Sequence, residues 1–245
     1  MTDAVSAEAT VPDWRVYPPM ELPRILEVAL TEIVEHGYDA TSVRTIAREV
    51  GVTVPALYYH YENKQAILVA LLEHAMTTVG GHIDGALADA GDDPVRRLSA
   101  VVEATALYMA TYRDLAFLDS ERRSLTPENR VRYAGHRDRI DGLLRSAIED
   151  GCRTGIFATP VPDSARRAIF TMCQGIATWY RPDGPRTPTE TARDYVRIAL
   201  SAVECRDVRG DLRVDPLAQP ALADECATGQ PGAKVPRRET SKPLG

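Results

Sequence analysis

The chain has 245 residues and a formal net charge of −6, with 44% hydrophobic and 26% charged residues. This balance is typical of a globular protein and excludes a collagen, a wholly disordered chain and a membrane bundle. No uninterrupted apolar run approaches the roughly 18 residues of a bilayer crossing, and residues 1–13 lack the apolar core of a signal peptide. We therefore expect a cytoplasmic protein without a membrane partner.

The two ends of the chain differ in composition from the middle. Residues 1–19 show no apolar periodicity and include one arginine, Arg15, whereas residues 206–245 contain five prolines, four glycines and no aromatic residue. Neither end offers enough apolar area to offset the entropy of ordering it. We expect a flexible N-terminal arm over 1–19 and a disordered tail over 206–245.

The middle of the chain has helical periodicity throughout. Apolar residues recur at helical spacing over 22–34, and Gly37 is expected to end this first helix. A second strong stripe covers 67–79 and is expected to end at the Gly80-Gly81 pair.

Four further helical patterns follow, over about 94–111, 127–151, 163–180 and 188–204. Each begins with a proline or an oxygen-bearing cap, as helix starts require. No stretch alternates with period two over a length that predicts a strand. The expected fold class is all-α.

The most informative stretch is TSVRTIAREVGVTVPALYYHYENK, residues 41–64. Thr41 or Ser42 caps a short helix, Gly51 turns the chain, and Pro55 lies in the first turn of a second short helix. A helix, a short turn and a helix form the geometry that places one helix in the major groove of DNA. The spacing alone also fits an ordinary pair of helices in a bundle.

The run from Arg24 to Leu72 resembles the DNA-binding head of the TetR (tetracycline-repressor-like) family of bacterial transcription regulators. The matching pieces are RILEVAL, EHGYDATSVRTIAREVGV, PALYYHY and NKQAIL. The resemblance implies a homodimer with an all-α body, and a repressor that a small molecule releases from a palindromic operator of double-stranded DNA. Such a protein is associated with the bacterial nucleoid when it binds its operator.

The resemblance also divides the chain into parts. We expect a DNA-binding domain over 20–66, with its helix-turn-helix motif at about 42–61. A ligand-binding and dimerisation domain is expected over 67–205.

Residues that open the second short helix face base edges in this motif; here they are Thr53, Val54, Pro55 and Ala56. Thr53 can form hydrogen bonds, and the other three offer apolar contact, for instance to a thymine methyl. The resemblance implies phosphate contacts for Tyr58 and His60 and a base contact for Tyr59. Tyr58 could instead be a core aromatic residue, and His60 a plain surface residue.

Phosphate contacts are also expected at the start of the first short helix, from Ser42 and Arg44. The resemblance adds Lys64 as a phosphate ligand. Residues 20–75 nevertheless carry four basic and eight acidic side chains, a net charge of −4. Binding must therefore depend on a few placed contacts and on two heads per site, and non-specific affinity should be weak.

An apolar stripe in the body, with Tyr108, Met109 and Tyr112, fits either a helical core or a ligand pocket. The family places its ligands between body helices, which favours the pocket. Further candidates for ligand contacts are Phe117, Phe170, Met172 and Trp179.

Two segments resemble the bodies of TetR regulators that control lipid, sterol and acyl-CoA degradation: WYRPDGPRTPTETARDYVRIAL at 179–200 and ERRSL at 121–125. The implied effector is an acyl-CoA or related thioester, whose phosphates would need arginines at the pocket mouth. The candidates are Arg122 first, then Arg113, Arg123, Arg130, Arg132, Arg137 and Arg139. These arginines could equally be solvated helix faces, and the effector could be an aromatic drug-like compound of an efflux or detoxification system.

The last two helices pair across the dimer axis in this family. Their apolar faces contain small residues that allow close approach: Ala168, Ile169, Met172, Gly175 and Ile176, then Tyr195, Ile198, Ala199, Ala202 and Val203.

Other classes of protein find little support in the sequence. No HExxH, GxSxG, phosphate-binding glycine loop or CxxC pair is present, and the four cysteines lie far apart. We expect no enzyme, no catalytic residue, no cofactor and no metal. A TetR-like fold that binds only a protein partner, without DNA activity, is the remaining alternative.

Overall fold

The structure is a computed structural model of the chain and describes residues 13–206. Within these residues the secondary structure is helical, apart from an isolated bridge between Phe157 and Cys205. The helices are α1 (Arg24–His36), α2 (Val43–Val50), α3 (Val54–His60), α4 (Lys64–Ala90), α5 (Pro94–Thr111), α6 (Arg113–Phe117), the 3-10 helix η1 (Leu118–Ser124), α7 (Pro127–Arg153), α8 (Pro162–Trp179) and α9 (Pro188–Ala202). The predicted all-α class is confirmed.

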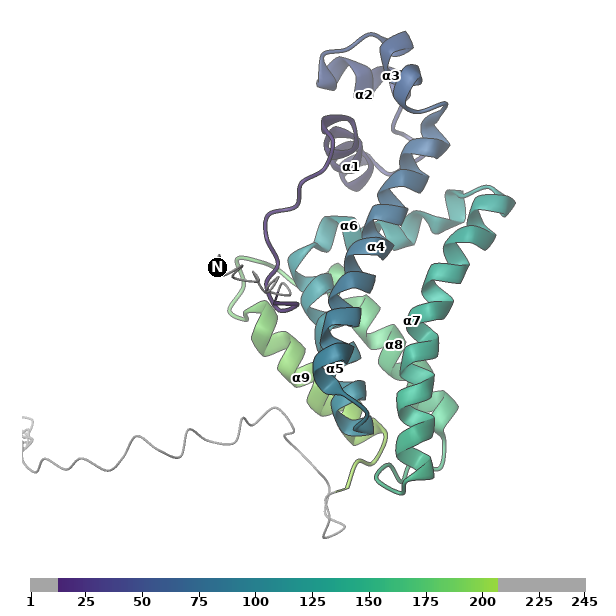
Figure 1. The fold of residues 1–245 in the computed structure, drawn as a ribbon. Coiled ribbons are helices and arrows are strands. Elements are labelled where there is room, and N and C mark those ends of the chain that lie inside the picture. The colour runs from purple at the N-terminus through teal and green to yellow at the C-terminus, as the bar shows by residue number, and fades with distance from the viewer. Residues whose placement is uncertain (1–12, 207–245) are drawn as a thin grey trace, which may run out of the picture.

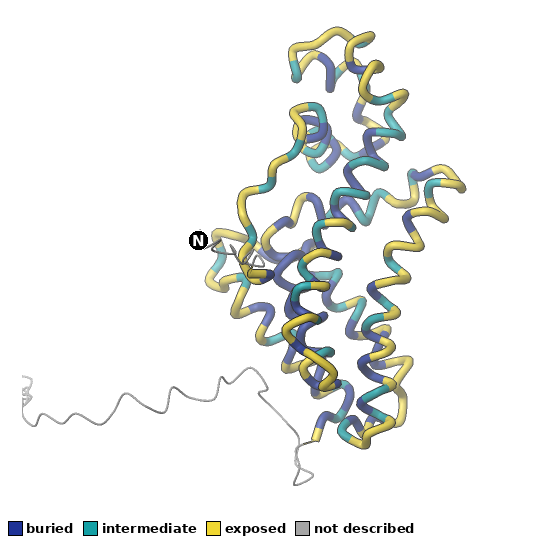
Figure 2. The backbone as a smooth tube through the Cα atoms, in the orientation of Figure 1, coloured by how far each residue is buried: buried dark blue, intermediate teal, exposed yellow. Residues whose placement is uncertain are grey.

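Helices α1 to α3 form a small head at one end of the molecule, and α4 runs from this head into the larger body (Figure 1). Helix α5 is the centre of the body, because it packs against α4, α7, α8 and α9 and most of its 18 residues are buried. Figure 2 shows this buried interior continuing along α4 toward the head. One hydrophobic core therefore joins the two parts.

The predicted end of α4 at Gly80-Gly81 is wrong, since the helix continues to Ala90. A glycine within a helix costs about 1 kcal/mol relative to alanine, but the burial of α4 against α5 and α7 outweighs that cost. A Cβ on Gly85 would lie 2.9 Å from the Trp14 Cβ, so glycine lets the N-terminal segment approach the helix.

Helix α4 is also long and apolar enough to cross a membrane by length and composition alone, with a mean hydropathy of 1.3 over its best window. The sequence contains no such uninterrupted run because polar residues are interspersed along it. Its packing against α5 and α7 is that of a core helix.

The expectation of a flexible arm over 1–19 is wrong for residues 13–19, which lie against the body together with Met20. We call residues 13–20 the strap. Trp14 donates a hydrogen bond to Asp89 at 2.7 Å, and Arg15 forms an ion pair with the buried Glu103 at 2.8 Å. The Tyr17 ring stacks on His82 with 3.9 Å between ring centroids. Residues 1–12, and residues 207–245 of the expected tail, lie outside the described part of the chain.

Candidate DNA interface and effector cavity

Two capped helices and a left-handed glycine build the helix-turn-helix. Ser42 caps α2 by accepting a hydrogen bond from the Thr45 N–H at 3.0 Å. Gly51 ends α2 with φ +82°, and Thr53 then caps α3 by accepting from the Ala56 N–H at 3.3 Å. Of the two caps that the sequence allowed for α2, Ser42 is therefore the one used.

The inner faces of α2 and α3 supply the core of the head. Ile46, Ala47 and Leu57 are almost fully buried, as are the apolar residues of α1 that face them. Thr41 is buried as well, and its hydroxyl donates to the Gly37 carbonyl at 2.9 Å. This packing fixes α3 at the far end of the head, with its opposite face in solvent (Figure 1).

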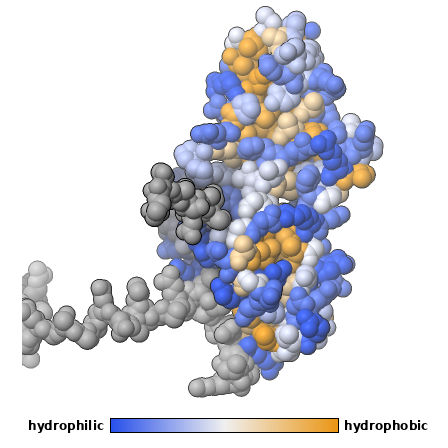
Figure 3. Space-filling view, viewed as in Figure 1, coloured by the Kyte–Doolittle hydropathy of each residue, from blue (hydrophilic) through white to orange (hydrophobic). Residues whose placement is uncertain are grey.

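The side chains expected on DNA lie mostly on that solvent-facing side. Tyr58 is 47% exposed and Tyr59 is 87% exposed, which excludes the core alternative for Tyr58. Exposed positions also include Ser42, Arg44, Thr53, Pro55, Ala56 and His60, whereas Val54 is half-buried. The surface of the head mixes hydrophobic and hydrophilic side chains (Figure 3).

Two basic residues are engaged within the protein. The Lys64 ammonium donates to the carbonyls of Tyr38 at 2.7 Å and Thr41 at 2.9 Å, and lies 4.1 Å from the centroid of the Tyr38 ring. The expected phosphate role of Lys64 is therefore replaced by a structural one, because its donors are directed at the backbone. Arg15 of the strap is held by Glu103 in the body, away from the head.

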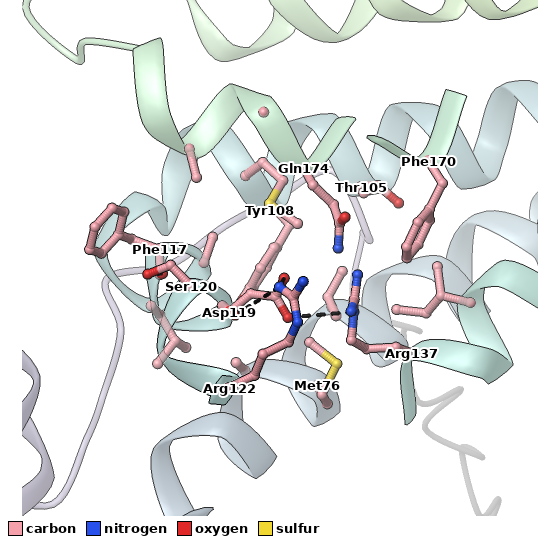
Figure 4. A pocket seen from close by; sticks show the side chains of 18 of the residues that line it. Met76, Thr105, Tyr108, Phe117, Asp119, Ser120, Arg122, Arg137, Phe170 and Gln174 are labelled. Carbon is pink, nitrogen blue, oxygen red and sulfur yellow. Dashed lines mark hydrogen bonds and ion pairs between the residues drawn. The ribbon is translucent and has the colours of Figure 1, made fainter. Parts of the chain in front are cut away.

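The body contains a cavity of about 300 Å³ between α4, α5, the α6–η1 segment, α7 and α8 (Figure 4). Its walls are largely apolar, with residues such as Met76, Val79, Leu115, Ile140 and Phe170. Polar side chains also line it: Thr105, Asp119, Ser120, Arg122, Tyr133, Arg137 and Gln174.

Four of the ligand candidates that the sequence suggested line this cavity together with Phe170: Tyr108, Met109, Phe117 and Arg122. Tyr112, Met172 and Trp179 do not line it, so the assignment is wrong for them. Tyr112 lies one turn beyond Tyr108 and donates to the Pro18 carbonyl of the strap at 2.6 Å. Trp179 is 47% exposed and stacks on Tyr195 of α9, and Met172 lies on another side of α8 from the cavity-lining Phe170 and Gln174.

The expected arginine-rich mouth is wrong for five of the seven arginines, since only Arg122 and Arg137 line the cavity. Arg132 pairs with Glu73 and Arg139 with Asp84 on the surface. The other three donate to backbone carbonyls: Arg113 to Ala177, Arg123 to Ser120, and Arg130 to Arg123 and Leu125. Five of the seven arginines are therefore surface or structural residues, as the alternative interpretation of the sequence allowed.

The two cavity arginines surround one carboxylate that the sequence did not single out. Asp119 accepts hydrogen bonds from Arg122 at 2.8 Å and from the Tyr133 hydroxyl at 3.0 Å, and lies 3.4 Å from the Arg137 Nε. Burial raises the pKa of Tyr133 far above its usual range, so its hydroxyl remains a neutral donor. The cluster of Asp119, Arg122 and Arg137 has a net charge of +1.

Partly exposed apolar side chains run along α8 and α9: Ala168, Met172 and Trp179, then Tyr195, Ile198 and Ala202. Ile198 is 50% exposed. The other expected dimer residues, Ile169, Ile176, Ala199 and Val203, are buried inside the protomer, which corrects their assignment. Gly175 lines the cavity instead.

Comparison with known proteins follows the division between head and body. Residues 25–71 match the model of "Bacterial regulatory proteins, tetR family", and residues 91–203 match "Tetracyclin repressor-like, C-terminal domain". The HTH-type transcriptional repressor KstR2 of Rhodococcus jostii (strain RHA1) is 24% identical over 181 residues, which cover 73% of this chain and 89% of that protein.

Solved structures are similar over nearly their whole length. The TetR family transcriptional regulator PfmR from Thermus thermophilus is 33% identical, with a TM-score of 0.67 over 73% of this chain and 98% of that chain. The structure of AibR in complex with isovaleryl coenzyme A and operator DNA is 26% identical, with a TM-score of 0.63 over 72% of this chain and 97% of that one.

Proposed function

Because the chain belongs to the TetR family of bacterial transcription regulators, we propose that it is a dimeric repressor that an effector bound in the body cavity releases from operator DNA. The observation that carries this proposal is the course of α4. Its first turn lies in the head, where Lys64 binds the Tyr38 and Thr41 carbonyls, and Met76 and Val79 further along line the cavity. Occupancy of the cavity can therefore bias the position of the head.

The exposed side of α2 and α3 forms the DNA interface in this proposal. Thr53, Pro55 and Ala56 at the start of α3 meet base edges, and the strongly exposed Tyr59 reads a base. Phosphates are held by Ser42 and Arg44 at the start of α2 and by Tyr58 and His60 on α3. Val54, which is half-buried, contributes only an apolar edge.

The proposed effector is an acyl-CoA or a related thioester. The cavity is largely apolar and has two arginines, and a similar solved protein is named as a complex with isovaleryl coenzyme A. A volume of about 300 Å³ lies at the lower end of the range of about 300–1,000 Å³ for ligand pockets, which suits an acyl chain but not a whole coenzyme A. The nucleotide part of coenzyme A would therefore lie outside the cavity. Because the proposed repressor acts on operator DNA, we also propose that it works in the cytoplasm.

An aromatic drug-like effector is the second candidate, because Tyr108, Phe117 and Phe170 also line the cavity. Release in either case needs an effector that binds the DNA-incompetent arrangement of the heads more tightly, since equal affinity for both arrangements shifts nothing.

The test begins with sequencing of the genomic DNA that the full-length protein captures. A bound site is then labelled with a fluorophore, and acyl-CoAs, the matching free acids and free coenzyme A are titrated into the complex. We expect a thioester to release the operator at micromolar concentration and free coenzyme A to have no effect. Release by an aromatic compound alone would refute the thioester assignment, and capture of no specific sequence would indicate a partner-binding module instead.

A further inference from the structure

The hydroxyl of Tyr108 is buried without a hydrogen-bond partner among the described residues. The side chain is 0% exposed and lines the cavity from α5, where Figure 4 shows it beside Asp119. Burial is the main reason that the pKa of Tyr108 lies far above its usual range, with smaller contributions from Tyr17, Tyr112 and Asp119, so the group remains a neutral donor. Buried polar groups are nearly always paired, because an unpaired one loses its hydration without compensation.

A second donor without a hydrogen bond, although it forms an ion pair, lies on a residue that lines the same cavity from α7. The Nε of Arg137 is buried and forms no hydrogen bond, although it lies 3.4 Å from an Asp119 oxygen. Asp119 is already supplied with hydrogen bonds by Arg122 and Tyr133. In Figure 4, Tyr108, Asp119 and Arg137 lie close together, and Phe170 lies beside Arg137, whose guanidinium is 5.4 Å from the centroid of the ring.

We propose that Tyr108 and Arg137 form a subsite for a hydrogen-bond-accepting oxygen on the effector, either a thioester carbonyl or a carboxylate, with the alkyl chain along the apolar wall. This inference rests on the proposed cavity function and adds the residues that determine its specificity. Two donors without hydrogen bonds, on residues that line one cavity, suit an acceptor, and the net charge of +1 on the cluster favours negative charge there.

Discrimination comes from the hydrogen bonds that such an oxygen gains. Bonds to a neutral hydroxyl and to a guanidinium together correspond to about a tenfold to hundredfold preference over an analogue that lacks the oxygen. An analogue of equal chain length still fills the apolar wall, so it should bind, but weakly.

The test uses three probes and the full-length protein in isothermal titration calorimetry. Octanoyl coenzyme A carries the carbonyl, S-octyl coenzyme A is the thioether without it, and octanoate carries a carboxylate. We expect the wild-type protein to bind the thioester or the acid at least tenfold more tightly than the thioether. Tyr108→Phe should reduce that preference to about twofold or less, and Arg137→Lys, which keeps the charge but removes the Nε, should reduce it in part.

Tyr112→Phe is the matched control, because it makes the same chemical change one turn along α5 and outside the cavity. It should leave the probe preference unchanged but lower the melting temperature, since it removes a bond to the strap. Tyr108→Phe should reduce the probe preference and leave the melting temperature unchanged. Its hydroxyl has no hydrogen-bond partner among the described residues whose loss could destabilise the free protein.

Several outcomes would overturn the subsite. One is that the wild-type protein binds the thioester and the thioether equally, and another is that it binds neither of the oxygen-bearing probes. The subsite would also be overturned if Tyr108→Phe kept the wild-type preference, or if Tyr108→Phe and Tyr112→Phe lowered the melting temperature by the same amount. Binding of octanoate without the thioester would refute the thioester effector while leaving the subsite in place. Operator binding in the same samples tests the repressor function separately.

Discussion

Lys64 shows how a charged residue near a DNA interface can serve the fold instead. Its ammonium binds the Tyr38 and Thr41 carbonyls and lies 3.4 Å from the Asp39 carbonyl, so it ties the loop after α1 to the start of α4. Arg44 is exposed at the start of α2, where the proposal places a phosphate contact. The two cations should therefore affect different measurements.

We predict that Lys64→Ala lowers the free energy of unfolding by about 1–3 kcal/mol, because it leaves carbonyls of the head without their donor. Arg44→Ala should leave stability nearly unchanged and reduce the slope of log affinity against log salt by about one unit per head. Urea unfolding and operator titrations at several salt concentrations separate these effects. A flattened salt slope in Lys64→Ala, with unchanged stability, would restore the phosphate role.

The candidate site was predictable where a residue's role depends on local spacing. The turn at Gly51 and the position of Pro55 in the first turn of α3 follow from the helix-turn-helix spacing, which also narrowed the cap of α2 to Thr41 or Ser42. Tyr108 and Tyr112 share one stripe on α5, yet one lines the cavity and the other contacts the strap. That difference depends on which segment packs on each turn, and periodicity contains no such information.

Asp119 lay beyond sequence reasoning for a similar reason. It meets Tyr133 and Arg137 only because η1 and α7 fold against each other. The periodicity of the sequence predicted α5 with its observed bounds. It did not predict α6 and η1, because these elements are too short to show a helical repeat. Tertiary contacts rather than local propensity define this part of the body.

Element η1 also connects the cavity wall to the head through one side chain on α4. The Gln65 amide donates to the Tyr38 hydroxyl at 3.0 Å and to the Ser124 carbonyl at 3.1 Å, and its oxygen accepts from the Thr126 N–H at 2.9 Å. Asp119 and Arg122 of the same η1 segment line the cavity. A shift of η1 on effector binding would therefore reach the loop after α1 through Gln65.

We predict that Gln65→Leu, which keeps the side-chain volume but removes all three bonds, weakens the coupling between effector and DNA about threefold to thirtyfold. The affinity of the free protein for the effector should not change, because Gln65 does not line the cavity. Calorimetry without DNA gives the affinity of the free protein for the effector. Effector titration of the operator complex then gives the coupling between effector and DNA. Asn129→Leu on α7 makes a similar change at a half-buried position outside the effector cavity, and this control should behave as the wild type does. Unchanged coupling in Gln65→Leu would exclude this connection.

The whole molecule has too few basic groups for one head to bind DNA strongly. Its net charge is −6, residues 20–75 carry four basic against eight acidic side chains, and Lys64 is engaged within the protein. Non-specific attraction to phosphates is correspondingly small. In the proposed function, operator affinity comes from two heads that bind together, so the association of protomers is part of the binding function.

The exposed apolar stripes of α8 and α9 are the proposed surface for that association, with Ile198 half exposed near Tyr195 and Ala202. We predict that Ile198→Glu converts the dimer into monomers, because two carboxylates would be buried close to the two-fold axis without partners. Operator affinity should then fall by about 10²-fold or more, since a single head keeps only its half-site contacts. Val131→Glu is the matched control, because Val131 is 75% exposed on α7 and lies outside both stripes. Sedimentation velocity and operator titration should show a monomer with weak binding for Ile198→Glu and a dimer with full binding for Val131→Glu. A wild-type protein that remains monomeric on DNA, or an Ile198→Glu dimer with full affinity, would place the interface elsewhere.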